Sequence, residues 1–199
     1  MPTFVTGDVL TASFMNAMTR MNLAQEDLAL EPIPIMGWRY ASGNTVDATG
    51  AAGNPKIIPG GWGSGTLKLE GQDAHGATKT ETVQFEVTLP DSYVAGETVT
   101  LSVSGRFSDT GTGTMSAKSI DVEAYEVAEA GTAGADICAT AAQTLTTSMA
   151  AYAFTLTPTA LIAGDKINIF ARIVLTESGG TGAQKAEFGG ATLKRDIKG

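Results

Sequence analysis

The sequence predicts an all-β fold, an antiparallel β-sandwich of the jelly-roll type that follows an N-terminal helical arm. Two observations predict the sandwich. After residue 66, apolar and polar residues alternate in many short runs, as they do in strands with one buried face. Segments rich in Gly, Ser and Thr separate these runs and supply the turns that antiparallel strands need. A third observation predicts the arm, because apolar residues between positions 8 and 30 recur at helical spacing.

The first expected element is an amphipathic helix from Ala12 to Leu28, which lies within an arm of residues 1–30. Thr11 is a suitable N-cap for this helix. The apolar stripe is too short to form a core of its own, so it must pack on the following domain or on another chain. We predict that the stripe serves assembly, through the side chains of Leu10, Phe14, Met18 and Met21.

Residues 31–65 are predicted to form an irregular linker and interaction segment. The run Glu31-Pro-Ile-Pro ends the helix, because residues before proline are driven out of the α region. Gly, Asn, Ala and Pro dominate from residue 41 onward, which is typical of irregular structure. The large side chains Trp38, Tyr40 and Trp62 are interface candidates, and packing into the core is the alternative for them.

Residues 66–199 are assigned to the sandwich. The alternation is clearest between Val83 and Leu89, and similar runs predict strands at 66–69, 99–103, 120–124, 152–156, 167–173 and 191–193. Short strands with one apolar face each are not stable as a single open sheet, so two sheets must pack face to face. The residues in the apolar phase form the expected core: Phe85, Val87, Val99, Leu101, Val122, Phe154, Ile167 and Ile169.

One internal similarity supports repeated corners in this sandwich. The segments 90–101 and 158–169 align without gaps, and both contain a proline, then an Ala-Gly-acid run, then a strand. Proline ends one strand, and glycine permits the turn before the next strand begins. We interpret this as a recurrent corner, with gene duplication as the alternative.

Charge and hydropathy exclude two classes of partner. The 199 residues contain 13 Lys and Arg against 21 Asp and Glu, which gives a net charge of −8. A polyanion would repel such a protein, so we expect no nucleic-acid partner. The longest nearly uncharged stretch, residues 139–161, is rich in Thr and Ser, so we expect no membrane span. The first residues lack a basic region, and we therefore expect no secretory signal.

Cysteine and histidine usage limits the possible chemistry. Cys138 and His75 are single copies, so an intrachain disulfide framework, a multi-cysteine zinc site and paired-histidine catalysis are impossible. His75 lies in a Gly- and Ala-containing turn between expected strands, which indicates an exposed loop residue. No nucleophile, metalloprotease or phosphate-loop motif occurs, and the glycine-rich run around Trp62 lacks the lysine of a phosphate loop.

Carboxylates are the remaining chemical candidates. Asp121, Glu123 and Glu126 could supply the acid pair of a glycoside hydrolase, but their positions on an alternating strand favour a solvated face. Asp109 in a Thr- and Gly-rich turn could contribute to a calcium site, although no Asp-x-Asp spacing supports one. We predict no enzyme activity, no cofactor and no metal.

The N-terminal segment 4–18 resembles the opening of tailed-bacteriophage virion proteins, in which a Thr-Gly-acid-x-Leu-Thr-Ala turn leads into a short helix that carries an asparagine. The matching residues are Thr6, Gly7, Asp8, Leu10, Thr11, Ala12 and Asn16. The remaining chain resembles, in composition and strand pattern, the jelly-roll domains of phage decoration (cement) proteins, head fibres and tail appendages. The resemblance implies symmetric oligomers, most often trimers, that attach through an N-terminal arm and have no catalytic residues.

Two functions therefore compete. The first is a capsid decoration or cement protein of the virion, made in the host cytoplasm, that binds the major capsid protein or another virion protein and its own copies as a homotrimer. The alternative is a carbohydrate-binding or receptor-binding module of a head or tail appendage, in which Trp38 or Trp62 would stack on a glycan. An exposed row of aromatic side chains over one sheet face would favour the alternative.

Overall fold

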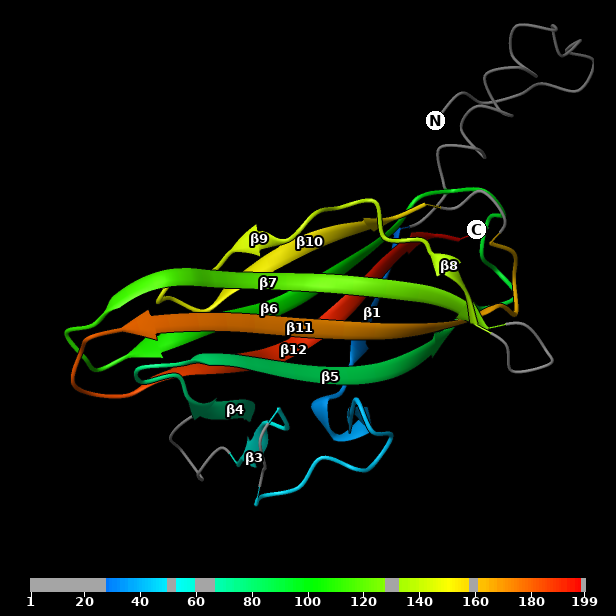
Figure 1. The fold of residues 1–199 in the computed structure, drawn as a ribbon. Helices are drawn as coiled ribbons and strands as arrows, with labels where there is room; N and C mark the ends of the chain where they lie inside the picture. The colour runs from blue at the N-terminus through cyan, green and yellow to red at the C-terminus, as the bar shows by residue number, and fades with distance from the viewer. Residues whose placement is uncertain (1–27, 50–52, 60–66, 128–132, 158–160, 198–199) are drawn as a thin grey trace, which may run out of the picture.

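The computed structural model describes residues 28–49, 53–59, 67–127, 133–157 and 161–197. These residues form two antiparallel β-sheets that pack face to face (Figure 1). The predicted all-β sandwich is thereby confirmed, and its topology is consistent with a jelly roll. The predicted helix and the arm of residues 1–30 lie outside the described residues except for their last residues, which belong to a strand. No helix within the described ranges is long and apolar enough to cross a membrane.

The first sheet contains six of the described strands. Five of them follow one another in the order β10 (Ala150–Leu156), β6 (Val99–Asp109), β12 (Gln184–Asp196), β4 (Lys68–Asp73) and β3 (Lys56–Ile58). The sixth, β1 (Leu28–Ile33), also pairs with β12, beside the residues from Ala191 to Asp196. Because β4 pairs with the earlier residues of β12, β1 and β4 share one side of that strand.

The second sheet also contains six described strands. Its order is β2 (Arg39–Tyr40), β5 (Thr78–Thr88), β11 (Lys166–Ser178), β7 (Thr114–Val127) and β8 (Ala133–Asp136). Strand β9 (Gln143–Thr144) pairs with β7 as well, and a short 3-10 helix, η1 (Ile35–Gly37), links β1 to β2. Residues 31–65 therefore supply strands to both sheets, where an irregular linker was expected. Strands β1 and β2 find partners far away in the sequence, and β3 pairs with the nearby β4.

The core lies between the two sheets. All eight side chains that the alternation assigned to it are buried, with exposed fractions of 6% or less. Trp38 joins this core from the segment before β2. Its ring stacks on Phe85 of the second sheet with a centroid distance of 4.9 Å and contacts the edge of Phe188 of the first sheet at 6.0 Å.

The two predicted corners share one backbone geometry. Gly96 and Gly164 have φ values of 82° and 89°, which non-glycine residues rarely adopt. In each corner the acidic residue that follows donates a backbone hydrogen bond of 3.2 Å, from Glu97 to Val94 and from Asp165 to Ile162. Both corners cross between the sheets, and they also touch, because the amide of Gly96 donates to the carbonyl of Leu161 at 3.4 Å. The recurrent corner is confirmed.

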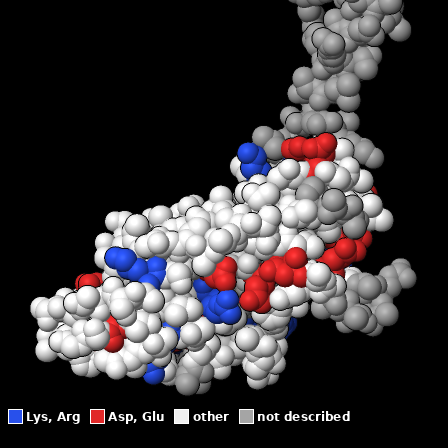
Figure 2. All heavy atoms as spheres, turned by 45° about the horizontal axis from the view of Figure 1, so that its top comes forward, with Lys and Arg blue, Asp and Glu red and all other residues white. Residues whose placement is uncertain are grey.

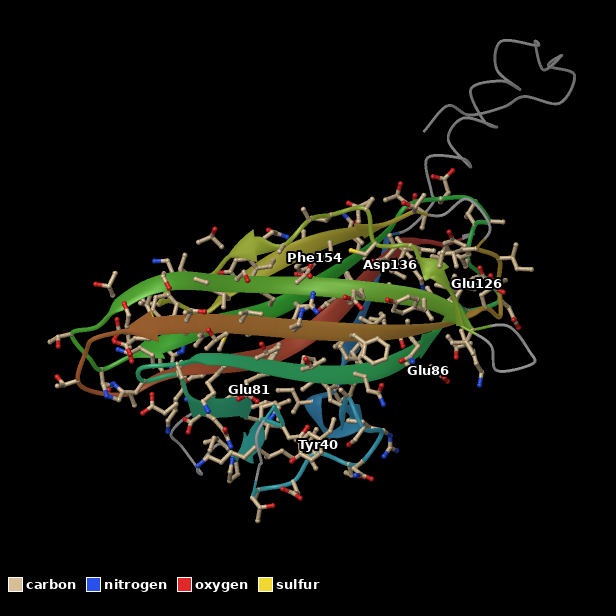
Figure 3. All side chains as sticks on the ribbon, viewed as in Figure 1. Tyr40, Glu81, Glu86, Glu126, Asp136 and Phe154 are labelled. Carbon is tan, nitrogen blue, oxygen red and sulfur yellow. The ribbon has the colours of Figure 1, made fainter. Side chains whose placement is uncertain are left out.

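One carboxylate lies on the core side of β5. The Glu81 side chain is fully buried, and its Oε1 accepts a 2.8 Å hydrogen bond from the amide of Gln72 (Figure 3). It fits there because Gly71 has no side chain: a Cβ at that position would lie 2.5 Å from Cγ of Glu81. Burial raises the pKa of Glu81, although the Gln72 amide partly opposes this effect.

This carboxylate predicts a pH dependence of stability. The folded-state pKa of Glu81 lies above the unfolded value, so its protonated form favours folding, and stability falls as pH rises through the folded pKa. Glu81→Gln keeps an oxygen acceptor for Gln72 and removes the charge. We expect the difference in unfolding free energy between the variant and the natural protein to shift in favour of the variant as the pH rises from 4 to 7. Urea unfolding of both proteins at the two pH values measures this shift. If the difference in unfolding free energy between the two proteins is the same at both pH values, the raised pKa of Glu81 is wrong.

Candidate functional site

The solvent side of the second sheet carries three rows of polar and aromatic side chains across β5, β11 and β7. Residues that face one another in adjacent strands point to the same side of a sheet, so the register defines each row. We call this surface the β5–β11–β7 face. Its rows are Glu86–Asn168–Tyr125, Gln84–Phe170–Glu123 and Thr82–Arg172–Asp121.

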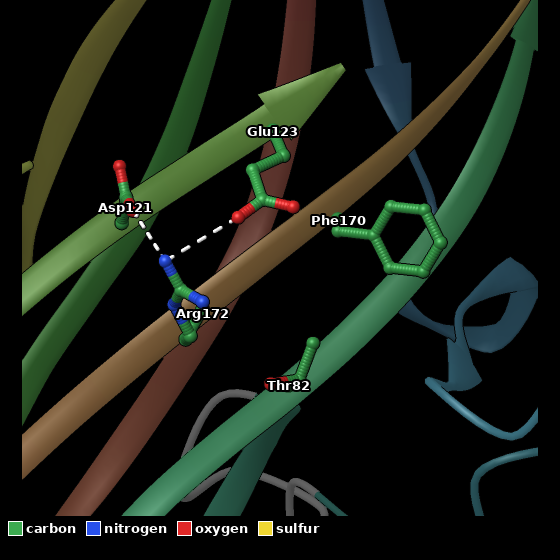
Figure 4. Close-up of a pocket in the computed structure, with 5 residues that line it drawn as sticks. All are labelled: Thr82, Asp121, Glu123, Phe170 and Arg172. Carbon is green, nitrogen blue, oxygen red and sulfur yellow. Dashed lines mark hydrogen bonds and ion pairs between the residues drawn. The ribbon is translucent and has the colours of Figure 1, made fainter. Parts of the chain in front are cut away.

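Arg172, on the central strand of this face, is held by two carboxylates from β7. Its Nη2 donates to Oδ2 of Asp121 at 2.7 Å and lies 3.4 Å from Oε1 of Glu123 (Figure 4). The hydroxyl of Tyr125 donates to the other oxygen of Glu123 at 2.9 Å. This hydrogen bond raises the pKa of Tyr125. The polar groups are thus fixed in orientation before any ligand arrives.

An aromatic pair lies beside these polar groups. Phe170 and Tyr125 are half-buried, and their rings meet edge to face with a centroid distance of 6.0 Å. Phe170 also borders a small hollow of about 70 Å³ together with Thr82, Asp121, Glu123 and Arg172 (Figure 4). An apolar ring next to fixed donors and acceptors can hold a ligand that has one apolar side and several hydroxyl groups.

A larger hollow of about 410 Å³ lies next to this one. Its polar lining comes from Arg39 of β2, Gln84 and Glu86 of β5 and Asn168 of β11. Gln84 pairs with Phe170 in the register, so the two hollows share one face of the sheet. A volume of this size is within the range of small-molecule sites.

The structure separates the predicted interface residues into two groups. Trp38 and Tyr40 expose 0% and 6% of their surface, which supports the core-packing alternative for both. The Tyr40 hydroxyl donates to Oδ1 of Asp47 at 3.2 Å and accepts from the Asp47 amide at 3.1 Å (Figure 3). The other predicted interface residues lie outside the described residues, and their role stays a prediction: Leu10, Phe14, Met18, Met21 and Trp62.

The other chemical candidates have ordinary surroundings. His75 lies in the β4–β5 turn, and its Nδ1 is 3.7 Å from the buried Glu177 carboxylate. Asp109 accepts hydrogen bonds from the amide of Gly111 and the side chain of Gln184. Within the described ranges, no group of three or more His, Cys, Asp or Glu side chains is arranged to hold a metal ion.

Phe170 and Arg172 are among the residues of this face that sequence reasoning missed. Both occupy the polar phase of β11, whose apolar phase drew attention to Ile169 and its neighbours. The available signal was an aromatic residue in the solvent phase of a strand. Its meaning emerges only when the register brings Glu123 of β7 beside it.

Comparison with known proteins gives no relative by sequence. No protein-family model matches the chain. No curated protein matches it either.

Several solved structures are similar at low identity. The CBM22-1 xylan-binding domain from Paenibacillus barcinonensis Xyn10C is 11% identical, with a TM-score of 0.46 over 87% of this chain and 96% of that one. The CBM36-1 domain of a multidomain xylanase from the hindgut metagenome of Trinervitermes trinervoides is 12% identical, with a TM-score of 0.35 over 84% and 96%. A chain of the infectious bursal disease virus Gx strain is 18% identical, with a TM-score of 0.34 over 84% and 37%. Similarities at this level carry no argument about function.

Proposed function

We propose that the chain is a non-enzymatic structural protein of a bacteriophage virion, with capsid decoration as its specific role. The observation that carries this proposal is the pairing of Leu28 with Asp196, which brings both ends of the described chain to one end of the sandwich. The loops 74–77, 110–113 and 179–183 lie at the opposite end (Figure 1). The twelve residue steps of β12 separate the two ends by about 40 Å. A segment attached before Leu28 would leave the whole sandwich free to project.

In this proposal the apolar stripe of the N-terminal segment attaches to the major capsid protein or another virion protein. Contact between copies as a homotrimer is supported by the charge distribution. Residues 137–157, which include β9 and β10, contain no charged residue. Figure 2 shows a broad area without charged side chains on this side of the molecule. Acidic copies can meet on such an area with little repulsion, because their charges stay at the rim.

Removal of residues 1–27 tests the attachment. We expect the truncated protein to fold, because every described strand begins at Leu28 or later, but to lose binding to capsids that lack this protein. Co-sedimentation with such capsids measures binding, and light scattering measures the mass of the oligomer. Phe14→Asp in the full chain is the matched point variant, and it should weaken binding more than any single change on a polar strand face. A truncated protein that still forms trimers and still binds would falsify this role.

The β5–β11–β7 face favours a second candidate function, the binding of a saccharide by an appendage module. A sugar ring has an apolar face that suits Phe170, and its hydroxyl groups suit the fixed Arg172 and Glu123 side chains and the Asn168 amide of the adjacent row. The face carries one half-buried aromatic pair, Phe170 and Tyr125, in place of the exposed aromatic row expected for this function. The decoration and saccharide functions use different surfaces and are compatible.

Phe170→Ala tests the second candidate. Loss of one aromatic contact of about 1–1.4 kcal/mol should weaken saccharide binding about 5- to 10-fold. A glycan array identifies the best-bound saccharide, and titration calorimetry then measures its affinity for both proteins. Phe170→Tyr, which keeps the ring, should retain most of the affinity. If no glycan binds the natural protein, or if Phe170→Ala binds equally well, the saccharide function is wrong.

A further inference from the structure

A separate hollow of about 420 Å³ lies on the outer side of the first sheet, where β3, β4, β12 and β6 meet. One part of its lining is apolar and comes from Ile58, Leu67 and Met149. The other part is ionic and comes from Lys68, Arg106 and Glu187. Neither part belongs to the β5–β11–β7 face.

A β-bulge keeps the floor of this hollow open. The register between β12 and β6 shifts between Phe188 and Gly190, so Gly189 is the extra residue of the bulged strand. A Cβ at Gly189 would lie 3.1 Å from Sδ of Met149 and 3.3 Å from Cβ of Ser104. Glycine therefore leaves room at this point, and Met149 lies beside it with 41% of its surface exposed.

The ionic part of the lining is built around a buried carboxylate. Glu187 is 2% exposed, and its two oxygens accept 2.6 Å hydrogen bonds from Nζ of Lys68 and Nε of Arg106. Burial alone would raise the pKa of Glu187, but these two hydrogen bonds bring the pKa below its usual value. Among the hydrogen bonds of the described residues, Arg106 donates through Nε alone, so its terminal nitrogens keep their donor capacity.

The ion-pair network of this surface has an excess of positive charge. Four cations, Lys56, Lys68, Arg106 and Lys185, share the two carboxylates Glu70 and Glu187. The excess of two positive charges is opposite in sign to the net charge of −8 of the whole chain. Such a local reversal favours an anionic ligand at this place.

We propose that this hollow binds a carboxylate that carries a short apolar group. The carboxylate would lie against Arg106 and Lys68, and the apolar group against Ile58, Leu67 and Met149. The three ionic residues of the lining, Lys68, Arg106 and Glu187, carry one net positive charge, which one carboxylate neutralises. A volume of about 420 Å³ accommodates a molecule of this kind. A free organic acid and the C-terminal carboxylate of a peptide share this chemistry.

Two pairs of probes test the chemistry on the full chain. Hexanoate and hexanamide form the first pair, and an acetylated pentapeptide that ends in leucine, with a free or an amidated C-terminus, forms the second. Calorimetry should show at least 10-fold tighter binding for the carboxylate member of a pair, weakening as salt rises. The pair that binds more tightly distinguishes a free acid from a peptide terminus. Equal affinity of acid and amide in both pairs, or no binding in either, would overturn the proposal.

Two variants test the location. Arg106→Gln should reduce carboxylate affinity at least 10-fold, whereas the matched removal of a cation on the other sheet, Lys118→Gln in β7, should leave it unchanged. Gly189→Leu should fill the floor of the hollow and abolish binding, while the Glu187 ion pairs persist. Circular dichroism verifies that each variant folds. If Arg106→Gln does not fold, Gly189→Leu decides: retained affinity in that folded variant places the ligand elsewhere and overturns the proposal.

Discussion

Trp38→Ala is expected to lower the free energy of unfolding by about 3–5 kcal/mol, the usual cost of removing a fully buried tryptophan. The indole ring is completely buried and contacts Phe85 in one sheet and Phe188 in the other. Its removal leaves a cavity between the sheets that the surrounding strands can only partly fill. Urea unfolding followed by fluorescence and circular dichroism measures the change, with the slope of the transition as a check for two-state behaviour.

Two neighbouring variants serve as controls for Trp38. Arg39→Ala, at an exposed position of β2, should change stability by less than about 0.5 kcal/mol. Trp38→Phe keeps an aromatic ring and should lie between the natural protein and Trp38→Ala. A cost below about 1 kcal/mol for Trp38→Ala, together with weaker capsid binding, would identify Trp38 as a contact residue after all.

The contrast between Trp38 and Phe85 shows what the sequence could predict. Phe85 lies in an alternating run, and this local pattern alone identifies a strand and its buried side. Trp38 lies between a three-residue 3-10 helix and a two-residue strand, which are too short to show any period. Its burial depends on the pairing of β2 with β5, a contact between residues more than forty positions apart. Sequence reasoning therefore left its role open.

The β5–β11–β7 face shows the same limit of local sequence patterns, which do not reveal contacts between distant strands. Alternation correctly placed Asp121 and Glu123 on a solvated face, because that inference needs only one strand. It did not combine them with Arg172 and Phe170 of β11, because three strands must be in register for these side chains to meet. The glycine bulge at Gly189 was equally hidden, since a bulge is defined by the residues of the partner strand.

Phe154→Ala is expected to cost about 3–5 kcal/mol as well, although Phe154 lies near the edge of a sheet. The side chain is fully buried in β10, the outermost strand of the first sheet, where its residue pairs with Leu101 of β6 (Figure 3). Among the described strands, only β6 pairs with β10 in a full ladder, so the inward phenylalanine contributes much of what holds this strand to the core.

The adjacent residue provides the matched control for Phe154. Thr155 belongs to the same strand but points to solvent, so Thr155→Ala should change stability by less than about 0.5 kcal/mol. Urea unfolding of both variants under the same conditions gives the comparison. A cost below about 1 kcal/mol for Phe154→Ala would mean that β10 can separate from the sandwich without loss of the core. Since residues 137–157 provide the uncharged surface proposed for contact between copies, a loosened β10 should also weaken the proposed trimer.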